Sequence, residues 1–596
     1  MLHNVHEMSH QLKKKLGVTL HADGAEFRVW APFAKGVTLV VPYLGVDDDS
    51  NKHEMTSEGD GYWYTRVETA AAGQTYKFHI DTGTTTLAKN DPRGRMLTSS
   101  DNGMSVIAAN TFEWGDDLFM PLPREEHIIY ELHIGTFNRK DPATQGTFYD
   151  AIEKLDYLQD LGITMIEVMP ITSMTYSNGW GYNTSDIFSV EPAYGGRHGF
   201  MEFVKACHAR GMGVIVDVVY NHFHHSDLWQ FDGWNEHDRG GIYFYNDERG
   251  DTPWGSRPDY GRPEVRQFLL DNIVMWFTEY RVDGLRLDST AYMRNTKGQN
   301  NDPAHDIPDA WSLMRDITEL SHKVRPGALL IAEDTSVNSL ITQPRNVGGA
   351  GFDAQWGLDF PHAIRQMVGA AVPFPVDLRQ ELTNYYNGDA FQKVIFSDSH
   401  DTAANGSTRI AAAITPTQPG SLLARKRLLV ASAITLTAPG IPMLLQGQEF
   451  MQEGAFNDWQ ELDWPKTEQF SGIVDAHKHL IDLRRNRFNN TSGLLGQSIA
   501  LFHSDEHNNL LAYHRWHTGG KGDDVLVIAN FNGDTLTHYN LALPIAGTWR
   551  IRFNSSWQGY SADFANNTTT EITTDATGQC TFTIPGYTVY ILSQDT

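Results

Sequence analysis

Between residues 127 and 489, short apolar runs alternate with segments of helical period. Each run is almost continuously hydrophobic and ends in polar residues, as in TMIEVMPI, GVIVDVVYNH and KVIFSDSH. Strands buried on both faces in a parallel sheet have this pattern. Eight such runs, most of them followed by a helical segment, predict an α/β fold with a closed (β/α)8 TIM barrel. An open, doubly wound sheet is the alternative.

The two ends of the chain follow a different pattern. Short β-rich runs such as AEFRVWAP and DVLVIANFNG are separated by turns, and they predict a β-sandwich on each side of the barrel. We therefore expect five parts: an N-terminal tail at 1–16, a β-sandwich at 17–112, a linker at 113–126, the catalytic barrel at 127–489 and a C-terminal β-sandwich at 490–596.

The chain has 596 residues, too many for a single hydrophobic core, which agrees with several domains.

The charge of the chain limits which molecules it can bind. Its formal net charge is −26. A protein this acidic repels phosphate backbones and anionic lipid surfaces, so we expect neither nucleic acid nor membrane as a partner. A neutral substrate fits better, and the oligomeric state is left open.

The cellular setting is predicted from what the sequence lacks. The two cysteines, Cys207 and Cys580, have no metal-ligand spacing and form no disulfide framework. No apolar run reaches ~18 residues, and the first residues lack the apolar core of a signal peptide. We therefore expect a cytoplasmic protein.

Polar residues gather at the predicted carboxyl ends of the barrel strands, where barrels of this kind carry their active sites. Each acid alone is more often structural than catalytic. Clustered acids repel one another, however, and a fold tolerates them with compensation or for function. The strand-end residues are Asp217, Asn221, His222, Arg286, Asp288, Glu333, Asp334, Asp398, His400 and Asp401.

Glycosidic bond cleavage needs one ionised carboxylate and one protonated acid on either side of the bond. In GLRLDST, Arg286 and Asp288 share one face of a strand, so the cation is expected to keep Asp288 ionised. Glu333 is expected to keep its proton through desolvation and neighbouring charge. Asp401 and His400 then hold sugar hydroxyls. A merely structural ion pair is the alternative for Arg286 and Asp288.

Two other chemistries are weaker. Oxygen- and nitrogen-bearing side chains at the strand ends raise a metal site as an alternative, yet the sequence has no contiguous calcium loop and no HExxH. No G-x-S-x-G elbow indicates a serine hydrolase. We expect neither a metal nor a cofactor.

The ordered segments DVVYNH, GLRLDS, IAED and SDSHD resemble the four motifs of the α-amylase superfamily, glycoside hydrolase family 13. FRVWAP and KNDPRGR are similar to the N-terminal, starch-binding-like sandwich of branching enzymes and maltooligosyltrehalose trehalohydrolases. NFNG and RFNSSWQGYS are similar to the C-terminal sandwich of the same clade.

The resemblance implies a retaining mechanism and assigns roles by motif position. Asp288 is the nucleophile, Glu333 the acid/base, Asp401 the transition-state stabiliser, and Arg286 orients Asp288. The implied substrate-binding residues are Tyr182, Trp180, Asp217, Asn221, His222 and His400. For Tyr182, a packed core aromatic is the alternative to a sugar platform. His208, on a predicted barrel helix, is expected at the surface.

The resemblance implies an α-glucan or maltooligosaccharide substrate and leaves three functions open. The first is a 1,4-α-glucan branching enzyme, which passes the cleaved chain to a 6-hydroxyl. The second is a hydrolase, such as a maltooligosyltrehalose trehalohydrolase or an α-amylase, because Thr402 stands where branching enzymes usually carry an acid. The third is an inactive glucan-binding protein.

Overall fold

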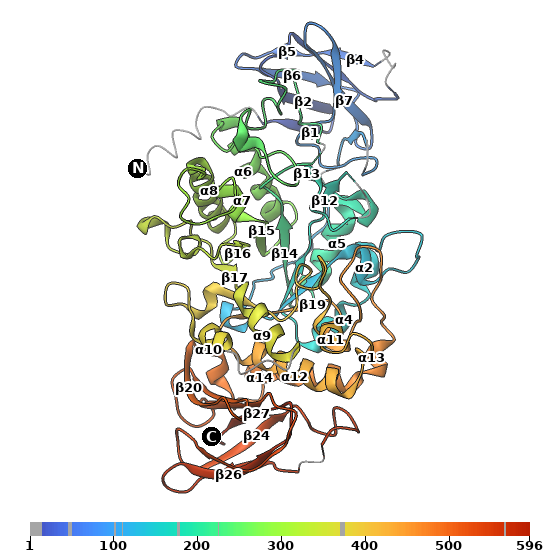
Figure 1. The fold of residues 1–596 in the computed structure, drawn as a ribbon. Coiled ribbons are helices and arrows are strands. Elements are labelled where there is room, and N and C mark those ends of the chain that lie inside the picture. Colours follow the sequence, from blue (N-terminus) through green and yellow to red (C-terminus); the bar gives the residue numbers. More distant parts are fainter. Residues whose placement is uncertain are drawn as a thin grey trace.

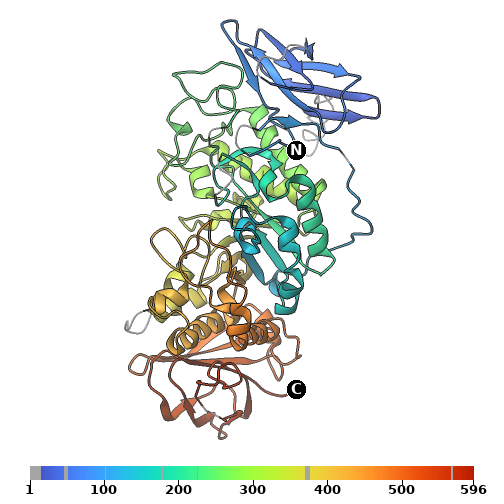
Figure 2. The ribbon, with the colours of Figure 1, turned by 90° about the vertical axis from the view of Figure 1, so that its right-hand side faces the viewer.

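A computed structural model describes most of the chain: residues 15–45, 51–100, 103–109, 111–175, 179–224, 226–369, 376–565 and 568–596. The expected N-terminal tail at 1–16 lies outside these residues except for its last two positions. Three bodies follow one another along the long axis of the molecule, a β-sandwich, a barrel and a second β-sandwich (Figures 1 and 2). The boundaries predicted between them stay predictions.

The central body is a closed barrel of eight parallel strands, which confirms the predicted fold class. Its strands are β10 (Ile129–Leu132), β11 (Met165–Val168), β14 (Gly213–Val218), β15 (Gly284–Leu287), β16 (Leu329–Ala332), β17 (Ala354–Trp356), β18 (Lys393–Ile395) and β19 (Ile441–Leu445). Strand β10 pairs with β11 on one side and with β19 on the other, which closes the ring. Every residue of these strands is buried, which explains their nearly continuous apolar pattern.

Amphipathic helices cover the barrel. The longer ones are α5 (Gly196–His208), α6 (Pro263–Thr278), α8 (Pro308–Val324), α9 (Asp359–Gly369), α12 (Leu422–Thr437) and α14 (Ser471–Arg484). In α5, Phe200, Phe203, Val204 and Cys207 are buried at helical spacing, so one face packs on the barrel. Helix α12 is buried on nearly all sides because it lies between the barrel and the C-terminal sandwich (Figure 1).

The N-terminal body consists of two facing antiparallel sheets. One contains β1 (Gly17–His21), β2 (Gly24–Trp30), β6 (Tyr62–Val67) and β5 (Thr56–Ser57). The other contains β4 (Lys52–Glu54), β3 (Gly36–Val40), β7 (Thr75–Asp81) and β8 (Thr86–Lys89). Alternate residues of β7 are buried, so Tyr76, Phe78 and Ile80 fill the space between the sheets. This body is the sandwich that the short β-rich runs predict.

The C-terminal body is also built from two sheets. Its larger sheet has the order β20 (Ser498–Asp505), β21 (Leu510–Trp516), β22 (Val525–Asn530), β27 (Thr588–Ser593), β24 (Thr548–Asn554) and β25 (Glu571–Thr573), and the smaller one pairs β23 (Leu536–Ala542) with β26 (Gln579–Ile584). Strand β27 lies against α12. The sandwich therefore covers the last barrel helices, α12 and α14.

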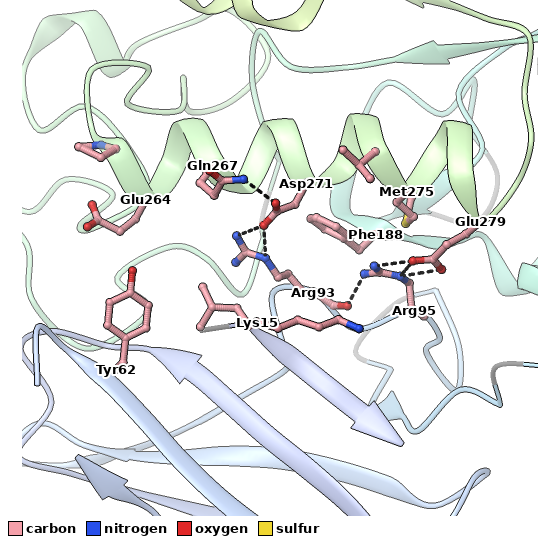
Figure 3. A pocket seen from close by; sticks show the side chains of 13 residues that line it. Lys15, Tyr62, Arg93, Arg95, Phe188, Glu264, Gln267, Asp271, Met275 and Glu279 are labelled. Atoms are coloured by element: carbon pink, nitrogen blue, oxygen red, sulfur yellow. Dashed lines mark hydrogen bonds and ion pairs between the residues drawn. The ribbon is translucent and has the colours of Figure 1, made fainter. Parts of the chain in front are cut away.

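The N-terminal sandwich docks on helix α6 around a cleft of about 410 Å³ (Figure 3). Arg93 binds Asp271 at 2.8 Å, and Arg95 binds Glu279 at 2.8 Å. Tyr62 on β6 forms the far wall of the cleft. Each arginine that the sandwich brings to the helix thus meets a carboxylate.

The linker after the sandwich is fixed to the barrel at His208, which corrects our expectation of a surface group. His208 is buried at the end of α5, with its two ring nitrogens 2.8 Å from Asp117 and 2.8 Å from Asp283. Phe119 stacks on the ring with a centroid distance of 4.5 Å. The sequence pattern gave no sign of this contact because Asp117 and Asp283 are remote from His208 along the chain.

Within the part of the chain that the structure covers, no helix is long and apolar enough to cross a bilayer. Cys207 and Cys580 are both buried and unpaired.

Candidate active site

Arg286 is the centre of the polar cluster at the carboxyl ends of the strands. It lies on β15 and is fully buried. Its Nη1 donates hydrogen bonds to Asp217 Oδ2 at 2.6 Å and to Asp288 Oδ1 at 2.9 Å. Its Nη2 lies 3.3 Å from Glu333 Oε2. The pair noticed in GLRLDST is therefore part of a four-residue cluster and not an isolated ion pair.

Both oxygens of Asp288 have a fixed donor. Oδ1 accepts from Arg286, and Oδ2 accepts from the amide of Asn221 at 2.6 Å. The same amide donates to the backbone carbonyl of Asp288 at 3.0 Å. The side chain is still 13% exposed, so a reacting carbon can approach an oxygen whose direction the protein has already set.

Glu333 is held as an acid. Burial raises its pKa to about 8, the cation of Arg286 opposes this shift, and the negative charges of Asp288 and Asp401 add to it. Its Oε2 accepts a hydrogen bond of 2.8 Å from the backbone N–H of Ser289. Ser289 has a φ of 45°, in the left-handed region, at the start of α7 (Thr290–Arg294). This turn directs the N–H toward Glu333.

Asp217 lies deeper and anchors its neighbours. Burial raises its pKa to about 6, against the opposing effect of Arg286. Its Oδ2 accepts hydrogen bonds from Arg286 and, at 2.7 Å, from the hydroxyl of Tyr182. Asp217 thus fixes the aromatic ring of Tyr182 next to the cluster.

Tyr182 and His400 form a stacked pair, with ring centroids 5.3 Å apart and an interplanar angle of 22°. Trp180 meets His400 edge-on at 5.6 Å. The guanidinium of Arg286 lies 4.4 Å from the ring centre of Trp356, which is also 6.0 Å from the ring of His400. Trp180 and Tyr182 are partly exposed and form walls of the kind that sugar rings pack against, whereas Trp356 is fully buried.

The two histidines have different environments. Burial lowers the pKa of His222 to about 4, so it is neutral, and its Nδ1 lies within hydrogen-bond distance of Asn221 Oδ1. Its Nε2 is buried without a hydrogen-bond partner among the residues that can be described. Burial also opposes a charge on His400, but Asp401 and Glu131 raise its pKa to about 9.

Asp401 is the most open acid of the group. Its side chain is 44% exposed, and its Oδ1 lies 3.5 Å from His400 Nε2. It is therefore the acid of the cluster with the most contact with solvent.

Sequence comparison identifies the fold family of this site. The family model described as "Alpha amylase, catalytic domain" matches residues 132–259 and 232–485, more than half of the chain. The chain belongs to the α-amylase family. The model described as "Carbohydrate-binding module 48 (Isoamylase N-terminal domain)" matches 15–94, and "Alpha amylase, C-terminal all-beta domain" matches 502–595. The resemblance stated from the motifs is confirmed.

Two relatives in this family have different activities. The chain is 29% identical to the 1,4-alpha-glucan branching enzyme GlgB of Corynebacterium jeikeium, over 95% of this chain and 81% of that one. It is 31% identical to the malto-oligosyltrehalose trehalohydrolase of Saccharolobus solfataricus, over 76% of this chain and 78% of that one. Among solved structures, pullulanase type I from Bacillus subtilis, complexed with maltose, has the same fold, with a TM-score of 0.78, 20% identity and coverage of 99% and 87%.

All ten predicted site residues of this α-amylase family member lie in or beside the cluster. Two other strand-end acids do not belong to it. Asp334 pairs with Arg294 at 2.9 Å, and Asp398 pairs with Arg365 and accepts from the backbone N–H of Ile410. Their partners neutralise them, so their role is structural.

Three further residues of the site escaped the sequence analysis. Glu131 on β10 binds His400, Trp356 on β17 packs against Arg286, and Trp254 approaches His222 at 5.7 Å with 44% of its surface exposed. A signal existed for Glu131, an acid within the apolar run HIIYELHI. For Trp254 the signal was a general one: its loop, 223–262, is rich in Trp, Tyr, His and Asp, which fits a substrate wall or a lid but selects no single residue.

Proposed function

We propose that this protein cleaves α-1,4-glucosidic bonds in α-glucans by a retaining double displacement. The observation that carries this proposal is the unequal pair Asp288 and Glu333 on either side of Arg286. One carboxylate has both oxygens oriented by donors, while burial keeps the other protonated at neutral pH. A retaining glycosidase needs this combination.

In the first step, Glu333 gives its proton to the glycosidic oxygen while Asp288 attacks the anomeric carbon. The bond to the leaving chain breaks, and a glucosyl ester forms on Asp288. In the second step, Glu333 takes a proton from an acceptor hydroxyl, which attacks the same carbon and releases Asp288. Asp401, His400 and His222 hold the sugar hydroxyls, and Tyr182 supports the ring.

The group that attacks the glucosyl ester in the second step distinguishes branching from hydrolysis. We propose that this acceptor is a 6-hydroxyl of another glucan chain, as in 1,4-α-glucan branching. The similarity to the branching enzyme extends over 95% of the chain and includes the N-terminal module. Water as acceptor is the second candidate. It is favoured by Thr402, whose hydroxyl accepts from the backbone N–H of Ser399 at 2.8 Å and supplies no acid, and by the similarity to the trehalohydrolase.

Trp254 is suited to the acceptor side of the bond. It lies beside His222, and the edge of Tyr292 supports its ring at 4.9 Å. A half-exposed indole at the rim of the cluster offers a flat apolar surface to a second sugar ring.

The test is to incubate amylose with the protein, count α-1,6 linkages by proton NMR and measure reducing ends. New 1,6 signals with few reducing ends identify a branching enzyme. Reducing ends without 1,6 signals identify a hydrolase, and free trehalose from maltooligosyltrehalose then identifies its substrate. If neither product forms from any α-glucan, the protein binds glucan without cleaving it and the proposal is wrong.

The variant Asp288→Asn tests the mechanism itself. It removes the nucleophile with little change in shape, so activity should fall at least ~10³-fold while the circular dichroism spectrum stays the same. Activity near that of the wild type would contradict the role of Asp288.

A further inference from the structure

A buried carboxylate of the first barrel strand holds His400 from below the site. Glu131 lies on β10 with 1% of its surface exposed. Its Oε1 lies 2.6 Å from His400 Nδ1, and its Oε2 accepts from the backbone N–H of His400 at 3.0 Å. The carboxylate therefore fixes both the imidazole ring and the main chain of the loop that follows β18.

We propose that Glu131 is a positioning residue that keeps His400 a doubly protonated cation facing the sugar. This inference rests on the proposed function, and it adds a residue to the site that neither the motifs nor the family comparison assigns.

Both ring nitrogens of His400 meet a carboxylate. Nδ1 binds Glu131, and Nε2 lies 3.5 Å from Asp401 Oδ1. A neutral imidazole has one N–H and can serve only one of these acceptors, whereas the cation serves both. The titratable groups around His400 come from β10, β11, β15, its own loop and the segment between β12 (Thr172–Met174) and β13 (Thr184–Val190): Glu131, His133, Glu167, Arg286, Asp401 and Tyr182.

Glu167 explains why Glu131 supplies the negative charge. The two glutamates are register partners on β10 and β11, and both are buried. Burial raises the pKa of Glu167 well above its ordinary value, and the charge of Glu131 adds to this shift. Glu167 is thus the neutral member of the pair, while Glu131 pairs with the imidazolium.

The result is one cationic histidine, His400, and one neutral histidine, His222, in the same site. The Nε2 of His400 lies 3.5 Å from Asp401 Oδ1, its N–H is available to a sugar hydroxyl in the proposed function, and its ring stacks on Tyr182. Loss of the charge of Glu131 leaves burial as the stronger influence on His400. The imidazole then loses a proton at neutral pH, and with it one of its two donors.

The test is the pH profile of kcat/KM for Glu131→Gln, which keeps the shape of the side chain and removes its charge. At pH 5.5, where more of the His400 rings carry the second proton, the variant should lose less activity relative to the wild type than at higher pH. At pH 7.5 it should fall at least about tenfold, so its alkaline limb moves down by a pH unit or more. A purely structural defect lowers activity equally at both pH values, and that result would overturn the proposal.

Glu167→Gln is the matched control. It changes the adjacent carboxyl of the same layer, which is already neutral, so its pH profile should follow that of the wild type. Glu131→Asp keeps the charge and should restore part of the alkaline limb, which also serves as the test if Glu131→Gln does not fold.

A binding measurement separates this inference from the proposed function. In the Asp288→Asn background, titration calorimetry with maltoheptaose at pH 5.5 and 7.5 should show that Glu131→Gln weakens binding more at pH 7.5 than at pH 5.5. If Glu131→Gln lowered the affinity for maltoheptaose by the same factor at both pH values, the role proposed for Glu131 would be contradicted. A wild type that binds maltoheptaose but cleaves no α-glucan would instead contradict the proposed function.

Discussion

At the scale of residues, the site depends on giving similar side chains different protonation states. Arg286 is shared by Asp217, Asp288 and Glu333, yet burial acts on them unequally. The pKa is raised to about 6 for Asp217 and to about 8 for Glu333. A single buried cation therefore permits several acids in one place and leaves one of them able to donate a proton.

Glu333→Gln should separate the acid from the rest of the site. Cleavage of amylose should fall ~10²–10⁴-fold, because the leaving oxygen needs a proton. Cleavage of a glucosyl fluoride should fall much less, because fluoride leaves without one. Steady-state kinetics on both substrates measure the difference, and an equal loss on both would argue against the acid role.

The wild-type enzyme should lose activity as the pH rises through about 8, because Glu333 must be protonated in the first step. The stability of the fold should depend on pH in the same direction. The pKa of Glu333 is higher in the folded state than in the unfolded state, so the stabilisation linked to its proton is complete below about pH 4.5 and is lost as the pH rises through about 8. A pH profile of kcat/KM on amylose measures the limb. Activity that is constant from pH 7 to pH 10 would contradict this assignment.

The candidate site residues could be proposed from the sequence because they stand at strand ends in recognisable motifs. The sequence did not show that Asp334 and Asp398 have a structural role instead, because this role depends on ion pairs with the remote residues Arg294 and Arg365. The acid Glu131 is visible within the apolar run HIIYELHI, but its role was not predictable, since its partner His400 is 269 positions away.

At the scale of elements, the turn between β15 and α7 positions a backbone donor. Ser289 takes a left-handed conformation there, and its N–H binds Glu333. In this conformation every residue other than glycine has a strained backbone, and the strain is largest for residues with β-branched side chains.

Ser289→Val should therefore destabilise the protein by ~1–3 kcal/mol and reduce kcat, because relief of the strain moves the N–H away from Glu333. Ser289→Gly is the matched control and should keep the fold without this strain. Urea unfolding and amylose kinetics of both variants measure the two effects. Equal stability of the valine and glycine variants would show that the turn is not strained.

His208 connects the linker to the barrel through a second pH-dependent contact. Asp283 and Asp117 raise its pKa against the opposing effect of burial. Its contribution is therefore complete below about 6.5 and is lost as the pH rises through the raised pKa of the folded state.

His208→Ala should expose the linker to proteases. At pH 6, cleavage between residues 111 and 126 should be at least about tenfold faster than in the wild type, the effect of losing about 1.4 kcal/mol. At pH 9.5 the two proteins should differ less. A difference that does not change with pH would show that the charge of His208 does not hold the linker.

At the scale of the whole molecule, the periodicity of the apolar runs was enough to predict a barrel between two sandwiches. The way these bodies meet was not predictable. Arg93 and Asp271 lie 178 positions apart, and nothing in either local pattern relates them (Figure 3). The side chains that form such an interface do not differ, in the local sequence pattern, from other exposed polar residues of the same strand or helix.

Glu279→Gln should loosen the N-terminal sandwich from the barrel. Glu279 binds Arg95 and Arg197, so its loss leaves two partly buried guanidinium groups without a counter-charge, at a cost of ~2–5 kcal/mol to docking. Small-angle scattering should show a larger radius of gyration, and hydrogen exchange should increase in β6 and α6. Glu264→Gln, at the other end of the cleft, is the control and should change neither. An unchanged radius in Glu279→Gln would show that these ion pairs do not maintain docking.

The closure of the barrel determines when the site can exist during synthesis. Strand β10 needs β19 as its neighbour, and Tyr130 bonds Glu449, which the ribosome adds 319 positions later. Until then, one edge of β10 has no partner, and open strand edges attract other chains. During most of its translation the nascent protein therefore has an open sheet whose free edge can pair with other chains. The barrel, and with it the candidate active site, is complete only when β19 has left the exit tunnel.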